Sequence, residues 1–198
     1  MTSKVEIVNR SLDKLGADTI VDLTQDSENA RVMNRQYNIV LRALLRSFNW
    51  NCAITRIILA PMAVAPAFDF SYQFQLPADC LRPLFPFDVT DWIVENKKIL
   101  TNDGNSINLR YIRMLDDPND MDDCFVEVFA CKLAMEAAEK ITQSKTKRDL
   151  AAQEYKEAMI VARKANAYEK IPDEQSASSW VDSRIVGAVL DPSKLSGF

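Results

Sequence analysis

Residues 70–77 read FSYQFQLP, and this stretch decides the fold of the middle of the chain. Apolar and polar side chains alternate strictly from Phe70 to Leu76. That period of two predicts a half-buried β-strand with its aromatic residues on the covered face. Pro77 has no backbone N–H to donate to a neighbouring strand, so the strand is expected to end there. Strands are therefore predicted between two flanks that carry helical periodicity.

Other strand signals surround this stretch. Residues 52–59 predict an earlier strand, and residues 92–94 and 98–100 predict the two arms of a hairpin. A turn at residues 102–105 leads into a further strand over residues 107–114.

Prolines are concentrated in the same region, where they favour short strands and edges over any continuous helix. Residues 51–115 are therefore predicted to form a small antiparallel β subdomain. The prolines concerned are Pro61, Pro66, Pro77, Pro83 and Pro86.

The N-terminal flank predicts two helices. Ser3 and Glu6 have the spacing of a capping box, which starts a helix, and Gly16 tolerates the left-handed conformation that ends one, so the first helix is expected over residues 4–15. Ser27 is expected to cap the second. The buried face of that second helix is expected to comprise Ala30, Met33, Tyr37, Val40, Leu41, Leu44, Leu45 and Phe48.

Helical periodicity returns after an acidic run at residues 116–123. This run departs from a calcium-binding loop, because Met121 and Asp122 stand where an oxygen ligand and a glycine are required, so helix capping is its expected role. The third helix should bury Met121, Phe125, Val128, Phe129, Leu133, Met135, Ala137 and Ile141. A fourth helix over about residues 145–168 should bury Leu150, Tyr155, Met159 and Val161.

The predicted fold class is α+β and mainly α. Residues 1–50 and 116–170 are expected to form a helical bundle, residues 51–115 an inserted β subdomain, and residues 171–198 an extended C-terminal arm. The second and third helices both present wide apolar faces that only mutual burial can satisfy. Leu44, Phe48, Phe125, Phe129 and Leu133 are therefore expected to pack together.

The predicted C-terminal arm combines polar and strongly apolar stretches. Its apolar side chains are too numerous for a free tail in water, and packing onto the same chain is the alternative to a contact with a partner. Trp180 and Arg184 are the expected anchors, since Trp and Arg are enriched at the centres of interfaces. The predicted partner-binding residues are Trp180, Val181, Arg184, Ile185 and Val186.

Composition argues against several classes of protein. The chain has 24 Lys and Arg against 28 Asp and Glu, a formal net charge of -4, which gives no broad cationic field for nucleic acid. It contains no histidine, the commonest general acid–base and metal ligand. Four cysteines without metal-type spacing predict buried free thiols and folding in a reducing cytosol. No signal peptide or membrane-spanning run is expected.

Catalytic motifs are not evident. The sequence has four glycines and no phosphate-binding loop, so we expect no enzyme activity, no cofactor and no metal. A carboxylate pair such as Glu136 and Glu139 leaves a glycosidase as an alternative. Arginines also follow one face of the second helix, where they predict either a site for carboxylate or phosphate or a solvated or subunit-facing surface. These are Arg31, Arg35, Arg42 and Arg46.

Several short motifs, in order, resemble the tail tubular protein A family, the head-to-tail adaptors or gatekeepers of short-tailed bacteriophages. They are V-x-I-V-N-R-S-L-D-K-L-G at residues 5–16, LLRSFNWN at 44–51, F-x-Y-x-F-x-L-P-A-D-C-L-R at 70–82, CFVEVFACKLA at 124–134 and SWVDSR at 179–184. The similarity covers most of residues 3–170, and the LPADCLR segment at residues 76–82, with the preceding Trp50, is its most specific part.

The resemblance implies a structural protein of the virion tail or neck, assembled in the host cytoplasm. Its subunits would form a homo-oligomeric ring, expected to be a dodecamer, that binds the portal protein on one side and the tail nozzle protein on the other. DNA would pass through the channel without specific binding, and no membrane is involved. The alternatives are an adaptor-like peptidoglycan hydrolase (muramidase) and a monomeric bacterial scaffolding module.

Overall fold

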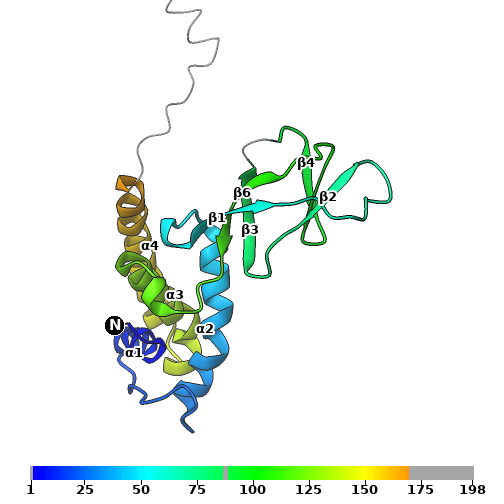
Figure 1. Cartoon of the computed structure of the whole chain (residues 1–198). Helices are drawn as coiled ribbons and strands as arrows, with labels where there is room; N and C mark the ends of the chain where they lie inside the picture. The colour runs from blue at the N-terminus through cyan, green and yellow to red at the C-terminus, as the bar shows by residue number, and fades with distance from the viewer. Residues whose placement is uncertain (1, 87–88, 170–198) are drawn as a thin grey trace, which may run out of the picture.

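The structure, a computed structural model, describes residues 2–86 and 89–169. The predicted arm at 171–198, with Trp180, Val181, Arg184, Ile185 and Val186, lies outside these residues. Figure 1 shows a helical bundle with a β subdomain projecting from one end of it. The chain is an α+β protein, mainly helical, which confirms the predicted fold class.

The described helices are α1, α2, α3 and α4, and α3 lies at the centre of the bundle because it packs against each of the other three. It is buried on almost every side, as a helix surrounded by others must be. The helices span Lys4–Leu15 (α1), Glu28–Ser47 (α2), Asp123–Thr142 (α3) and Lys145–Tyr168 (α4).

Helix ends follow the predicted capping. The Glu6 backbone N–H donates to Ser3 Oγ at 3.1 Å, the Ser3 N–H donates to Glu6 Oε2 at 3.4 Å, and Gly16 ends α1 with a φ of 63°. The acidic run starts α3, since Asp122 Oδ1 accepts from the backbone N–H groups of Cys124 and Phe125 at 2.8 and 3.2 Å. The predicted capping role of that run is confirmed.

The described strands form two three-stranded antiparallel sheets, in the orders β1-β6-β3 and β2-β5-β4. A two-residue turn joins β4 to β5, and both of its residues, Asn96 and Lys97, have positive φ, as the hairpin prediction requires. The strands span Ile54–Leu59 (β1), Tyr72–Gln75 (β2), Cys80–Pro86 (β3), Trp92–Glu95 (β4), Lys98–Thr101 (β5) and Ile107–Arg113 (β6).

A hydrophobic cluster that we call the bundle core fills the space between the helices. The expected packing of α2 on α3 is confirmed: Leu44, Phe125, Phe129 and Leu133 are buried in this core and Phe48 packs against it. Trp50 joins α2 to α3, because its ring centroid lies 5.1 Å from those of both Phe48 and Phe125 and its indole N–H donates to the Leu44 carbonyl at 3.0 Å.

A second cluster, the sheet core, lies between the described sheets. The central strand β6 contributes to both cores, since Leu109 and Tyr111 are buried in the sheet core and Ile112, on the opposite face, is buried in the bundle core. The sheet core comprises Leu59, Phe74, Leu76, Val89, Ile99, Ile107, Leu109 and Tyr111.

The strict alternation predicted for residues 70–76 is wrong in part. The strand β2 covers only Tyr72–Gln75, and within it Gln73 is 7 % exposed whereas Tyr72 is 39 % exposed. Gln73 can be buried because its side-chain amide forms hydrogen bonds with the Val64 carbonyl and with Lys98 Nζ. Local alternation does not reveal such non-local contacts.

The predicted buried face of α4 also needs correction. Leu150 and Val161 are exposed, and the buried positions of this helix are Ala151, Met159 and Ala162. Small alanines allow α4 to lie close against α3, so the larger side chains are displaced to the outer surface. Among the cysteines, all of which are free, only Cys131 is buried; Cys52, Cys80 and Cys124 are half-buried.

Candidate functional site

The loop between β1 and β2, residues 60–71, is the most apolar exposed segment of the β subdomain. No charged residue occurs between Arg56 and Asp69, and the side chains of Val64 and Phe68 are 69 % and 76 % exposed. Figure 1 shows this β1–β2 loop at the end of the β subdomain farthest from the helices. Large apolar side chains displayed in this way are typical of an interaction site.

Gln73 holds the β1–β2 loop in place. Its side-chain amide donates to the Val64 carbonyl at 2.7 Å, its side-chain oxygen accepts from Lys98 Nζ at 3.0 Å, and its backbone carbonyl accepts from the Met62 N–H at 2.8 Å. The loop is therefore tied to β2 and β5 while Val64 and Phe68 face solvent. Sequence reasoning missed these residues, although the long uncharged stretch was a signal for them.

Replacing Gln73 with alanine is expected to lower the free energy of unfolding by about 1–3 kcal/mol, because it removes a buried side chain together with its hydrogen bonds to the Val64 carbonyl and Lys98. Urea unfolding at neutral pH measures this change. Gln153→Ala is the matched control, since its amide forms one exposed hydrogen bond within α4. If both variants unfold at the same urea concentration as the parent chain, Gln73 does not anchor the loop.

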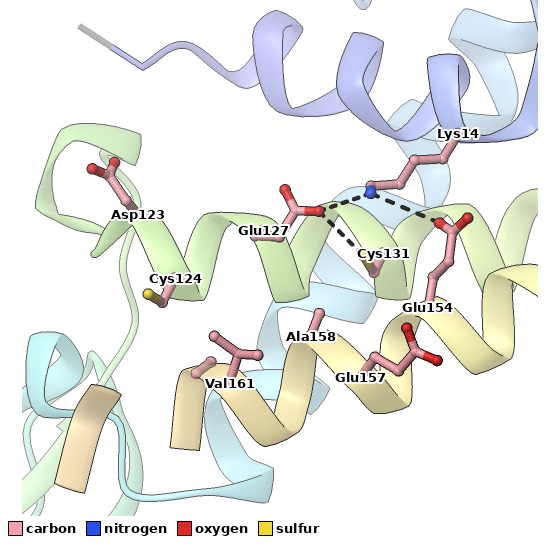
Figure 2. A pocket seen from close by; sticks show the side chains of 10 residues that line it. Lys14, Asp123, Cys124, Glu127, Cys131, Glu154, Glu157, Ala158 and Val161 are labelled. Atoms are coloured by element: carbon pink, nitrogen blue, oxygen red, sulfur yellow. Dashed lines mark hydrogen bonds and ion pairs between the residues drawn. The ribbon is translucent and has the colours of Figure 1, made fainter. Parts of the chain in front are cut away.

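A second set of exposed apolar side chains is spread along α4, where charged residues such as Glu154 and Glu157 separate them. It consists of Leu150, Ile160, Val161 and Tyr168. Beside it, a groove of about 430 Å³ runs between α1, α3 and α4. Figure 2 shows acidic side chains from α3 and α4 along this groove, with Cys124 and Cys131 of α3 among them.

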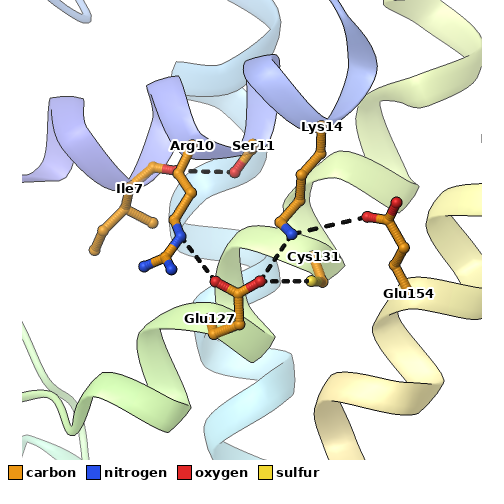
Figure 3. A network of polar contacts seen from close by, with 7 residues as sticks. All are labelled: Ile7, Arg10, Ser11, Lys14, Glu127, Cys131 and Glu154. Carbon is orange, nitrogen blue, oxygen red and sulfur yellow. Dashed lines mark hydrogen bonds and ion pairs between the residues drawn. The ribbon is translucent and has the colours of Figure 1, made fainter.

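Ion pairs around Glu127 tie the helices together at this groove (Figure 3). Arg10 Nε lies 2.8 Å from Glu127 Oε2, and Lys14 Nζ lies 2.7 Å from Glu127 Oε1 and 3.8 Å from Glu154 Oε2. Cys131 Sγ lies 3.6 Å from Glu127 Oε1, within hydrogen-bonding range. These contacts join α1 to α3 and α4.

The protonation states of this group fit a structural role. Burial raises the pKa of the Cys131 thiol to about 11, so at neutral pH it is protonated and a poor nucleophile. Burial acts to raise the pKa of Glu127, but the hydrogen bond and charge of Lys14 and the charge of Arg10 outweigh it and lower that pKa. Burial likewise opposes the charge on Lys14, but Glu127 dominates and the pKa of Lys14 is raised.

These shifts predict how stability depends on pH. A carboxylate whose pKa is lowered from 4.5 contributes stability above pH 4.5 that is lost as the pH falls through the lowered value. A lysine whose pKa is raised from 10.5 contributes stability below pH 10.5 that is lost as the pH rises through the raised value.

Glu127→Gln is expected to lower the melting temperature at neutral pH by about 2–4 °C and to flatten its acid dependence.

Thermal melting between pH 3 and pH 8 checks this expectation. Glu157→Gln is the control, because Glu157 lines the same groove and forms no ion pair with any described residue. A steep acid dependence retained by Glu127→Gln would show that other carboxylates produce it.

The arginine stripe of α2 divides into separate local contacts. Arg31 lies 2.6 Å from Asp26 and 3.5 Å from Glu28, and Arg46 donates to the Leu81 carbonyl of β3. Arg42 and Arg46 line a hollow of about 700 Å³ between α2 and the β subdomain, together with the acidic side chains Asp79 and Asp116. Part of the stripe therefore fastens α2 to β3.

The other residues singled out from the sequence are dispersed. Glu136 pairs with Lys132 at 2.7 Å and Glu139 pairs with Arg148 at 3.3 Å, both at the surface of α3. Within the described chain, no group of three or more His, Cys, Asp or Glu side chains is placed to hold a metal ion. Among the same residues, no helix combines the length and apolar character that crossing a membrane requires.

The chain matches no protein-family model, and no curated protein is similar to it.

Proposed function

We propose that the chain is a structural head-to-tail adaptor of a tailed phage virion, which forms a ring beneath the portal and connects it to the tail nozzle. One observation carries the proposal: a single small chain exposes large apolar side chains in several separate places, among them the β1–β2 loop and α4. An isolated protein would leave these side chains in water, whereas a subunit held between partners buries them. The motifs at residues 5–16 and 70–82 support the same function.

Each part of the fold has a place in this proposal. The helical bundle forms the body of the ring, and the β1–β2 loop offers Val64 and Phe68 to the tail-side partner. The arm, with Trp180 and Arg184, contacts a neighbouring subunit or the portal. The formal net charge of -4 repels DNA phosphates and favours sliding through the channel over binding.

Sedimentation of the purified chain, alone and with its cognate portal protein, tests the proposal. The expected result is a closed oligomer that sediments with the portal. A monomer that ignores the portal would overturn the proposal in favour of a bacterial scaffolding module. Release of sugar fragments from peptidoglycan, abolished by Glu136→Gln or Glu139→Gln, would instead favour a muramidase.

A further inference from the structure

The strand β1 is a free edge of its sheet. It pairs with β6 along its whole length, from Ile54 opposite Ile112 to Leu59 opposite Ile107, and no segment within residues 2–86 and 89–169 pairs with its other side. About half of the backbone N–H and C=O groups of an antiparallel edge strand point away from the sheet. β1 therefore offers hydrogen-bonding groups to an additional strand.

This edge also lacks the features by which sheets prevent strand addition. At the opposite edge of the same sheet, β3 contains Pro83 and Pro86 and has register shifts in its pairing with β6. β1 reads ITRIIL, without a proline, and its only charge is Arg56. Prolines, bulges and charges are the usual means of protecting an edge, so β1 is the accessible one.

The side chains of β1 indicate an apolar occupant. Ile57 lies on the same face as Leu59, at the rim of the sheet core, and is 38 % exposed. Ile58 on the other face is 69 % exposed. A hollow of about 370 Å³ lies against the strand, lined by Arg56, Ile57, Ile58, Asn108, Leu109 and Arg110. A further strand would cover both isoleucines.

The sequence beyond the described residues contains one stretch suited to this edge. Residues 184–190 read RIVGAVL, rich in the β-branched residues that strands favour. They follow residues 170–183, a serine-rich stretch with Pro172 that also contains the predicted anchor Trp180 and spans about 45 Å when extended. This stretch starts after Glu169, whose Oε2 accepts from Asn51 Nδ2 at 2.9 Å. A stretch of this length can extend well beyond the end of α4.

We propose that residues 184–190 of a neighbouring copy add to the free edge of β1 as a further strand, an inference that rests on the proposed self-assembly. Each copy then has one donor segment, which follows α4, and one acceptor edge, β1. Because donor and acceptor are different surfaces, the contact is head-to-tail, and repeating it generates a ring where the rotation between copies closes and an open filament where it does not. Pairing of β1 with β1 of a second copy would instead be two-fold symmetric and would end at a dimer.

Hydrogen exchange of the backbone amides of residues 54–59, in the full-length chain, tests this inference. Val186→Pro removes a backbone donor from the middle of the proposed strand, and Ser178→Pro is the matched control in the preceding stretch. In the assembled wild-type chain and in Ser178→Pro, those of these amides that point away from β6 are expected to exchange about tenfold or more slowly than in Val186→Pro. Sedimentation of the same samples should show smaller species for Val186→Pro alone.

Three results would overturn the inference. Equal exchange of residues 54–59 in the wild-type and Val186→Pro chains excludes the donor. If the amides of residues 54–59 stay protected after dilution to monomers, residues 184–190 pair with β1 of their own chain. A dimer of Val186→Pro that still protects β1 indicates pairing of two β1 edges. Co-sedimentation with the portal protein distinguishes failure of this inference from failure of the proposed function. A chain that joins the portal without protecting β1 contradicts strand addition alone. A chain that protects β1 but does not bind the portal contradicts the adaptor function alone.

Discussion

Phe125→Ala is expected to lower the free energy of unfolding by about 3–5 kcal/mol. The Phe125 side chain is fully buried at the point where α3 meets α2, with its ring centroid 5.1 Å from that of Trp50 and 6.3 Å from that of Phe129. Removing the ring takes away its buried apolar area and leaves a cavity that rigid helices on every side of α3 cannot close. Chemical denaturation followed by Trp fluorescence measures the change.

Ile160→Ala is the matched control, because it also shortens an apolar side chain but on the exposed side of α4. Its effect on the free energy of unfolding is expected to stay within about 0.5 kcal/mol. If Phe125→Ala proves no more damaging than Ile160→Ala, the bundle core does not depend on the contact between α2 and α3.

Truncation after Lys170 is expected to abolish attachment to the portal while the remaining chain stays folded. The deletion removes the predicted anchors Trp180 and Arg184, but the buried side chains of α4 lie upstream of it. Glu169, which bonds to Asn51, is also kept. Circular dichroism measures folding and co-sedimentation with the portal protein measures attachment.

Truncation after Asp191 is the control for this deletion, because it retains residues 171–191 and removes only residues 192–198. It is expected to attach as the full chain does. Global unfolding of the chain truncated after Lys170 would indicate that the arm packs onto its own subunit. Undiminished attachment would place the portal contact elsewhere.

The helices were predictable from sequence because their ends depend on local contacts. Ser3, Ser27 and Gly16 act on backbone groups within one turn, and the structure has α1 starting and ending, and α2 starting, as these residues indicate. The inner face of α4 was not predictable in the same way. The helical period predicts that large apolar side chains such as Leu150 and Val161 are buried. In the structure these two are exposed, and the smaller Ala151 and Ala162 lie in the narrow space beside α3.

The sheets and the candidate site depend on contacts between distant residues. Alternation around Phe74 predicts a strand, but it does not reveal that Gln73 turns inward to hold Val64 and Lys98. The alternation also does not reveal that the strands form two sheets, in the orders β1-β6-β3 and β2-β5-β4. The pairing of strands depends on contacts between residues far apart in the sequence. The exposure of apolar side chains on the β1–β2 loop becomes apparent only when these contacts are known.

The position of β6 has a mechanical consequence. This strand carries Leu109 and Tyr111 into the sheet core and Ile112 into the bundle core, and it is hydrogen-bonded on both sides, to β1 and to β3. The β1–β2 loop continues directly into β1, whose backbone leads back through residues 48–53 to α2 and is hydrogen-bonded along its length to β6. A force applied to the loop would therefore act both on the strand that the two cores share and on the end of α2.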